Sequence, residues 1–213
     1  MAKIRITYNA PVVLTFTIAA VGVFILNWAI PATREWFQAV PRLDGVASYI
    51  GLVGHILGHA NWQHLIGNFM LILLLGPILE ERHGSIPLLG MILITALVTG
   101  LINLALSSHG LLGASGIVFM MILLASMANV RGGEIPLTFI AVAVIYMGGE
   151  IIRAFRDDQI SQMAHLVGGV AGAAFGFIIA GKKKKPAAAA AKSGTSDLDK
   201  MLARATAKPG SKT

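Results

Sequence analysis

A single serine stands where a glycine-rich stretch becomes an apolar run. The stretch reads Gly113-Ala114-Ser115-Gly116, and residues 117–128 after it are almost wholly apolar. This pattern predicts a helix from Ser115 to about Val130, roughly 24 Å long, against a bilayer hydrocarbon core of roughly 30 Å. In a membrane, Ser115 would therefore lie below the surface. Unpaired amides and the positive dipole end at a helix start would let its hydroxyl act as a nucleophile beside an oxyanion site.

The same glycines have a structural explanation. Small residues in membrane helices commonly let neighbouring helices pack closely, and a lone G-x-S-G is more often packing than chemistry. Non-helical backbone at that depth must be buried in protein or face a water-filled cavity. Catalysis at Ser115 requires a general base at the same depth.

Two polar side chains upstream share one helix face. His64 and Asn68 are four residues apart in a predicted helix that Asn61 would cap. Both can donate a hydrogen bond to a carbonyl oxygen that becomes negative, which is the task of an oxyanion hole. The structural alternative is a polar clasp between two helices.

A histidine near the C-terminus supplies the missing base. His165 opens the run A-H-x-x-G-x-x-x-G, in which Gly168 and Gly172 form a smooth face for a close helix neighbour. If the helix that begins at Ser115 is that neighbour, His165 can act as the general base. Phe119, four residues after the serine, would pack against the His165 ring and orient it, or serve as ordinary core. We predict a Ser–His dyad without a carboxylate.

The composition indicates a membrane environment. The 213 residues are 55% hydrophobic and 13% charged, and the mean hydropathy is +0.74, values typical of a multi-spanning membrane protein. The first apolar run is too long for a cleaved signal peptide. The expected fold is therefore an all-α membrane protein, a bundle of six transmembrane helices. The predicted spans are residues 11–30, 62–79, 86–106, 115–130, 137–152 and 162–180.

Charge and cysteine content set further expectations. Nine of the 17 Lys and Arg follow Gly181, and there is no cysteine. The predicted organisation is a short cytoplasmic N-terminus (1–10), a membrane-embedded domain (11–181) and a basic, disordered cytoplasmic tail (182–213) attracted to anionic lipids. The positive-inside rule predicts that both termini are cytoplasmic. The expected location is the cell (inner) membrane. No nucleic-acid partner, metal or cofactor is expected.

The loop over residues 31–60 has two possible structures. Its second half, residues 50–57, is apolar and broken by glycine. That half either lies in the membrane interface or extends the next helix.

The predicted topology makes spans two, four and six parallel. Their first turns then carry His64 and Asn68, Ser115, and His165 at one depth. Burying a polar side chain in a bilayer costs free energy, so such side chains usually face the interior of the helix bundle. Three polar turns at one depth therefore favour a shared functional site over three separate packing contacts.

At these residues the chain resembles the rhomboid family of intramembrane serine proteases. The motifs H-x-x-x-N, G-x-S-G and A-H-x-x-G-x-x-x-G stand in that family's order on spans two, four and six. Further matches in residues 11–181 are His55 and His59, and the Glu80, Arg82 and Gly84 positions. Two departures are Ile50-Gly51 in place of a Trp-Arg pair in the first loop, and Phe119 in place of a tyrosine.

The resemblance implies a fold and an activity. Ser115 would be the nucleophile and His165 the base, while the Ser115 amide, His64 and Asn68 would form the oxyanion hole, with Gly113, Gly116, Phe119, Gly168 and Gly172 in support. Substrates would be membrane-anchored proteins cut in or near a transmembrane helix. The top of span five and the loop after it would form a lateral gate and cap.

Two other functions compete. A non-catalytic relative would bind transmembrane clients without cutting them, but such relatives typically lack the Ser or the His. A metal or haem site at His55, His59 and His64 would use histidines spaced by four and five residues. That site has no acidic or thiol ligand nearby, and it leaves Ser115 and His165 unexplained.

Overall fold

The computed structural model describes residues 7–127, 135–154 and 159–182. The predicted N-terminus up to residue 6, the end of the fourth predicted span and the basic tail after residue 182 lie outside these residues. The chain forms two compact units, residues 1–176 and 177–213. All site residues belong to the first unit, and the described part of the second continues a helix.

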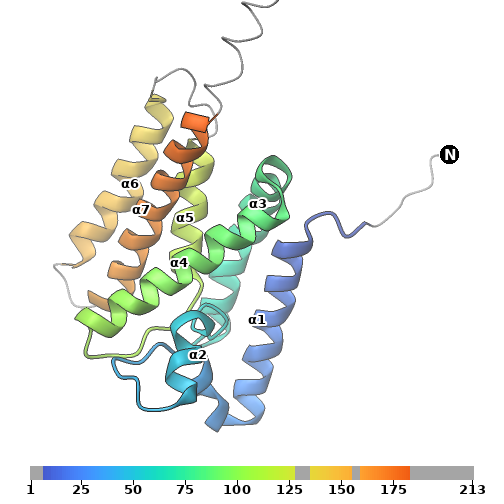
Figure 1. The fold of residues 1–213 in the computed structure, drawn as a ribbon, viewed down its shortest axis with the longest axis vertical. Helices are drawn as coiled ribbons and strands as arrows, with labels where there is room; N and C mark the ends of the chain where they lie inside the picture. Colours follow the sequence, from blue (N-terminus) through green and yellow to red (C-terminus); the bar gives the residue numbers. More distant parts are fainter. Residues whose placement is uncertain (1–6, 128–134, 155–158, 183–213) are drawn as a thin grey trace, which may run out of the picture. The chain divides into compact units, whose positions relative to one another are not determined.

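The described residues are almost entirely helical, and the only β-pairing among them is an isolated antiparallel bridge between Ala39 and Leu111. This confirms the all-α prediction. The elements are α1 (Pro11–Ala29), the 3-10 helix η1 (Pro31–Phe37), α2 (Val46–Gly54), α3 (Trp62–His83), α4 (Ser85–Leu106), α5 (Ser115–Ser126), α6 (Leu137–Ala154) and α7 (Gln159–Lys182), shown in Figure 1.

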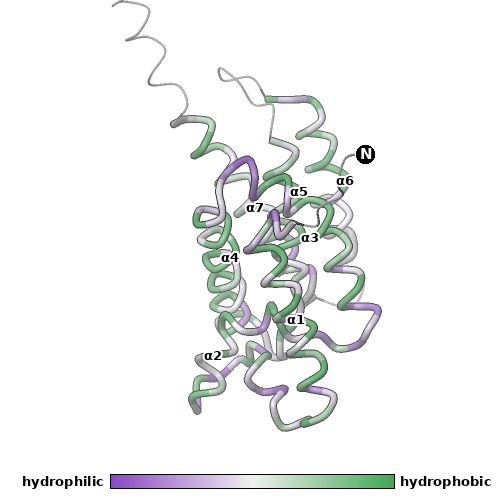
Figure 2. Tube along the Cα trace, turned by 90° about the vertical axis from the view of Figure 1, so that its right-hand side faces the viewer, coloured by the Kyte–Doolittle hydropathy of each residue, from purple (hydrophilic) through white to green (hydrophobic). Residues whose placement is uncertain are grey.

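Six of these helices coincide with the six predicted spans. Within the described residues, α1, α3, α4 and residues 162–180 of α7 are long and apolar enough to cross a membrane, whereas α5 and residues 137–149 of α6 are shorter apolar helices. Hydrophobic residues line most of the helices in Figure 2, and hydrophilic residues gather mainly at their ends and connections. The protein is a helical membrane protein, and the number of six crossings stays a prediction.

The first loop does not extend the next helix. Residues 46–54 form a separate helix, α2, which includes only residues 50–54 of the apolar half, and α3 begins at Trp62. Asn61 caps α3 as predicted, since its side-chain oxygen accepts a hydrogen bond from the His64 amide at 2.8 Å. Glycine explains the fit of the loop: a Cβ atom at Gly51 would collide with the carbonyl oxygen of Gln38, and one at Gly58 with that of Phe37.

A carboxylate from α3 fixes the start of α1. The Glu80 oxygens accept hydrogen bonds from the amides of Val12 and Val13, both at 3.0 Å, and from the Ser85 hydroxyl at 2.7 Å. A negative charge is favourable at a helix N-terminus, where amides lack partners within the helix. Glu80 therefore joins the end of α3 to the starts of α1 and α4.

Helix α5 forms the centre of the first unit. Every residue from Gly116 to Leu124 is buried, and α5 packs against α3, α4 and α6. A helix that is apolar on all sides is expected to be surrounded by other helices. The apolar run that follows Ser115 is thus a buried core helix, and Ser115 is its first residue.

Candidate active site

The backbone before Ser115 is held on two sides. Leu111 and Ala39 exchange backbone hydrogen bonds of 2.8 and 2.9 Å, and the Gly113 amide donates to the His55 carbonyl at 2.9 Å. Gly113 has φ +115°, a conformation that favours glycine. The N-cap of α5 is Ala114, whose side chain cannot occupy the amides of the first turn. The half-buried Ser115 therefore stands at a fixed helix start suited to binding an anion.

His64 and Asn68 lie against this backbone. A Cβ atom built on Gly113 would come within 2.6 Å of the His64 ring atoms Cε1 and Nε2, and within 3.7 Å of Asn68 Nδ2. The first two turns of α3 thus place both side chains beside the residue two positions before Ser115. The predicted shared face of His64 and Asn68 points to the start of α5.

Helix α7 brings His165 to the same level. A Cβ atom at Gly168 would collide with the carbonyl oxygen of Gly116, and one at Gly172 with that of Met120. The α7 backbone therefore lies directly on α5, with Gly168 level with the first turn. The His165 ring stacks on the Phe119 ring, with centroids 4.4 Å apart and planes inclined by 5°. This is the packing that the spacing of Phe119 from Ser115 suggested.

The three helices converge on one site. His64 of α3 lies against Gly113, and the Ala164 carbonyl of α7 lies 3.2 Å from a Cβ atom built on Gly116, so both helices border the start of α5. The structure thereby brings His64, Asn68, His165 and the Gly113–Gly116 backbone together, although they come from three separate segments of the sequence.

A neutral histidine orients Asn68. The Asn68 amide nitrogen lies 3.1 Å from His59 Nε2, and His59 Nδ1 lies 3.1 Å from the Leu57 carbonyl oxygen. The network is consistent if Nδ1–H donates to the carbonyl and Nε2 accepts from Asn68. Burial lowers the pKa of His59 to about 4, which keeps this acceptor unprotonated at neutral pH. Sequence reasoning noted His59 only as a match and missed this role.

A second buried histidine supports the loop before Ser115. His55 Nδ1 lies 3.2 Å from the carbonyl oxygens of Gly51 and Leu52, and Nε2 lies 3.2 Å from the Thr99 hydroxyl. Burial lowers the pKa of His55 to about 4, so the ring is neutral and Nδ1–H donates to the carbonyls. The Thr99 hydroxyl beside Nε2 also donates to the Thr95 and Ala96 carbonyl oxygens, both at 2.9 Å. The backbone carbonyl of His55 accepts the hydrogen bond from the Gly113 amide. Thr99 carried no sequence signal, because a threonine in an apolar helix usually bonds its own backbone.

A further residue that sequence reasoning missed is Gln162, one turn before His165. Its side chain is buried, and its Oε1 atom has no hydrogen-bond partner in the described part of the chain. A glutamine at the start of an apolar span is typical of an interface residue, so no sequence pattern selects it.

In the described part of the chain, the histidines are not grouped as metal ligands. The ring nitrogens of His55 and His59 are engaged by backbone and side-chain partners, and the described residues contain no group of three or more His, Cys, Asp or Glu that could hold a metal ion. The arrangement suits hydrogen-bond donation toward Ser115 better than metal coordination.

Comparison with known proteins identifies the family of this chain. The Rhomboid domain family matches residues 46–182. Rhomboid-related protein 1 of Caenorhabditis elegans is 33% identical over 201 residues, which cover 78% of this chain and 54% of that protein. Rhomboid protease GlpG of Haemophilus influenzae is 22% identical over 129 residues, which cover 59% of this chain and 67% of that protein. This chain thus spans about half the length of the nematode relative. The matched domain contains every residue of the site, and the chain belongs to the rhomboid family.

Proposed function

We propose that this protein is a serine endopeptidase that cleaves membrane-anchored proteins in or near a transmembrane helix, with Ser115 and His165 as its catalytic dyad. The observation that carries the proposal is the backbone contact of α7 with the first turn of α5, with His165 stacked on Phe119. A histidine held beside the first turn of α5 supports the pairing of His165 with Ser115 at the start of that helix.

The chemistry follows from these positions. The Ser115 oxygen attacks the carbonyl carbon of the scissile peptide bond as His165 accepts the hydroxyl proton. The negative oxygen of the tetrahedral intermediate is stabilised by the Ser115 amide and by donors on His64 and Asn68. His165 then gives its proton to the departing amine. Water attacks the acyl-enzyme by the same route in reverse, which releases the acid and restores Ser115.

The buried histidines maintain the donors. His59 accepts one N–H of Asn68, which leaves the second N–H of the amide available to the intermediate. His55 holds the Gly113 amide through its carbonyl, and this contact positions the backbone just before Ser115. Donors fixed in advance stabilise a transition state without reorganisation.

Substrate entry is assigned to α6. Its residue Met147 lies against Gly169 of α7, and the Tyr146 ring contacts Phe119 edge-on, with centroids 6.0 Å apart. Helix α6 therefore borders the site beside the His165–Phe119 stack. Outward movement of its top would admit a substrate helix laterally from the bilayer. The predicted cap is the loop over residues 153–161, of which residues 155–158 lie outside the described residues.

The placement in the cell belongs to the proposal as well. We assign the protein to the cell (inner) membrane, with both termini cytoplasmic and the basic tail after Gly181 attracted to anionic lipids. The membrane-embedded unit would extend over residues 11–181.

The test is cleavage of a transmembrane substrate in proteoliposomes by the wild type, Ser115→Ala and His165→Ala. The control is Ser126→Ala, on the same helix, because the Ser126 hydroxyl bonds the Leu123 carbonyl at 2.7 Å and lies at the other end of α5. We expect cleavage to be lost in the first two variants and kept in the control. Cleavage that survives Ser115→Ala would overturn the assignment.

A client-binding protein is the second candidate, since rhomboid relatives include inactive members. It predicts no cleavage by the wild type and no labelling of Ser115 by a serine-reactive fluorophosphonate. Labelling that is lost in Ser115→Ala and retained in Ser126→Ala would favour the protease even where the test substrate is not cut.

A further inference from the structure

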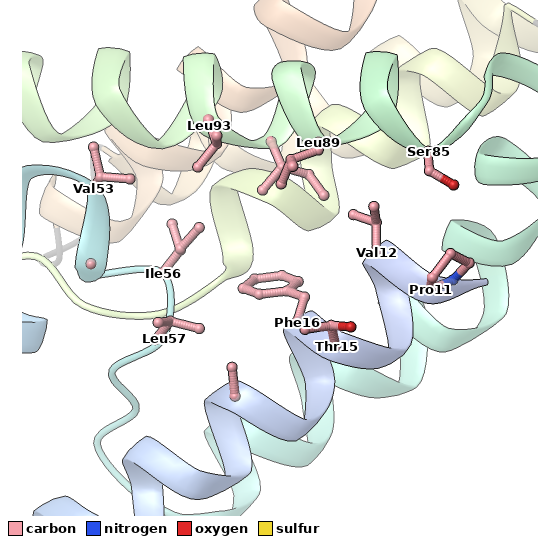
Figure 3. Close-up of a pocket in the computed structure, with 13 residues that line it drawn as sticks. Pro11, Val12, Thr15, Phe16, Val53, Ile56, Leu57, Ser85, Leu89 and Leu93 are labelled. Carbon is pink, nitrogen blue, oxygen red and sulfur yellow. The ribbon is translucent and has the colours of Figure 1, made fainter. Parts of the chain in front are cut away.

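A groove of about 510 Å³ lies between α1, the end of α2 and α4 (Figure 3). It shares no residue with the proposed catalytic site. Its walls include Phe16 of α1, Ile56 and Leu57 in the turn after α2, and Leu89 and Leu93 of α4. Leu89 and Leu93 are 42% and 43% exposed, so the α4 wall is accessible from outside the protein.

The lining offers almost nothing to a polar ligand. The hydroxyls on it are those of Thr15 and Ser85, and both have partners already. Thr15 Oγ1 is hydrogen-bonded to the Tyr8 hydroxyl at 3.0 Å, and Ser85 donates to Glu80 at 2.7 Å. A polar ligand would lose its hydration without replacement, whereas an apolar chain would lose nothing.

The helices on both sides of the groove define its surroundings. Both α1 and α4 are long and apolar enough to cross a membrane. A groove between two such helices faces lipid tails rather than water. An empty space of this size forfeits dispersion contacts along its walls, so the bilayer itself is the natural source of an occupant.

The length of the groove matches one leaflet. Its lining runs along α1 from Pro11 to Ala19 and along α4 from Ser85 to Leu93, about 12 Å of each helix at 1.5 Å per residue. One leaflet contributes about half of the roughly 30 Å hydrocarbon core. The groove therefore accommodates the chain of one lipid rather than a span across both leaflets.

The two ends of the groove differ. Glu80 binds the Val12 amide and the Ser85 hydroxyl, so the helix starts form one end, and Ile56 and Leu57 lie at the other (Figure 3). Glu80 is occupied there by the Val12 and Val13 amides and the Ser85 hydroxyl. The polar helix starts at this end suit the head group of a lipid, and the apolar walls beyond them suit its chain.

We propose that one acyl chain of a membrane phospholipid occupies this groove. Its head group lies at the Pro11 and Ser85 end, and the end of its chain lies against Ile56 and Leu57. The bound lipid joins α1 to α4 over the length where the groove separates them.

Photo-crosslinking of the full chain tests the site and its polarity. The protein is reconstituted in vesicles of phosphatidylethanolamine and phosphatidylglycerol that contain a phospholipid with a diazirine either at the acyl-chain end or next to the ester. We expect the chain-end probe to label residues 53–57 and the ester-proximal probe to label residues 11–15 and 85–89. Labelling spread evenly over lipid-facing positions such as Leu74 and Val144, or the reverse polarity, would overturn the proposal.

A variant that fills the groove provides a second test of the lipid site. Ala19→Trp places an indole in the groove, and Ala105→Trp makes the same change at an exposed position of α4 outside the lining. We expect at least a five-fold fall in labelling of residues 53–57 in the first variant and unchanged labelling in the second. Undiminished labelling in a folded Ala19→Trp protein would contradict the proposal. If Ala19→Trp does not fold, the labelling polarity of the unmodified protein decides the question.

A competing source of the same chain is a free fatty acid. A fatty acid that carries the chain-end diazirine is added to the same vesicles in the presence of excess phospholipid. We expect it to leave residues 53–57 unlabelled, and efficient labelling would show that the groove does not select a phospholipid.

Discussion

Two helix pairs in this protein are built in opposite ways. Helices α5 and α7 meet backbone to backbone, and their glycines leave no room for a Cβ atom. Helices α1 and α4 are tied through Glu80 at their starts and are separated beyond it by a groove of about 510 Å³. The first pair aligns His165 with the start of α5, and a catalytic geometry tolerates little displacement. The second pair carries no reacting group, so its gap can be filled by the surrounding lipid.

The largest expected effect on the cleavage rate comes from separating α5 and α7. Gly168→Ala should push α7 away from the Gly116 carbonyl and move His165 out of reach of Ser115. A displacement of about 1 Å can reduce the rate by about 100-fold. Initial cleavage rates in proteoliposomes provide the measurement.

The matched control is Gly90→Ala on α4, where an added Cβ atom meets no heavy atom within 4 Å. It should keep the wild-type rate. Equal activity of Gly168→Ala and Gly90→Ala would show that the α5–α7 contact does not set the catalytic geometry.

A smaller effect is expected at the support of the loop before Ser115. Thr99→Val removes the hydroxyl that lies 3.2 Å from His55 Nε2, so the buried ring nitrogen loses its polar contact. This should lower the free energy of unfolding by about 1–3 kcal/mol. The measurement is thermal unfolding in detergent micelles, with cleavage rate as a second readout.

Thr17→Val on α1 is the comparison, because the Thr17 hydroxyl bonds the Val13 carbonyl within its own helix. A loss in Thr99→Val no larger than that in Thr17→Val would remove His55 from the support of the site.

The buried histidines also predict a pH dependence. Burial lowers the pKa of His55 and His59 to about 4 from an ordinary value of 6.5. Between these values the unfolded chain binds protons that the native protein does not bind, so the free energy of unfolding should fall as the pH falls from 6.5 toward 4.

Unfolding temperatures over this pH range, measured for the wild type and for His55→Asn, provide the test. The variant should show a weaker dependence on pH, and His109→Asn, at an exposed position, should keep the wild-type dependence. Identical curves for His55→Asn and the wild type would refute the assignment.

The smallest effect, on the free energy of unfolding, is expected between α1 and α4. Leu89→Ala removes a half-exposed side chain from the groove wall, where a lipid chain can refill the space. We expect a loss of about 1 kcal/mol or less in the free energy of unfolding. Leu123→Ala, in the fully packed α5, should cost about 2–5 kcal/mol. Thermal unfolding of both variants in one detergent compares them, and equal losses would mean that the groove wall is packed like the core.

The sequence by itself determined the features that depend on near neighbours in the chain. The apolar runs predicted the positions of six helices, Asn61 predicted the cap of α3, and the residue spacing predicted that His64 shares a face with Asn68. These predictions succeed because helical periodicity and capping are local properties. The matched domain confirms the rhomboid family, which the order of the three motifs indicated.

Only the tertiary structure decided which distant groups meet. It separated α2 from α3, placed Glu80 on the start of α1, and paired His59 with Asn68 and His55 with Thr99. It also set the register in which Gly168 meets Gly116, and it opened the groove between α1 and α4. Each of these contacts joins groups whose partners cannot be read from periodicity. The packing of whole helices, rather than the pattern within any one of them, fixes such pairs.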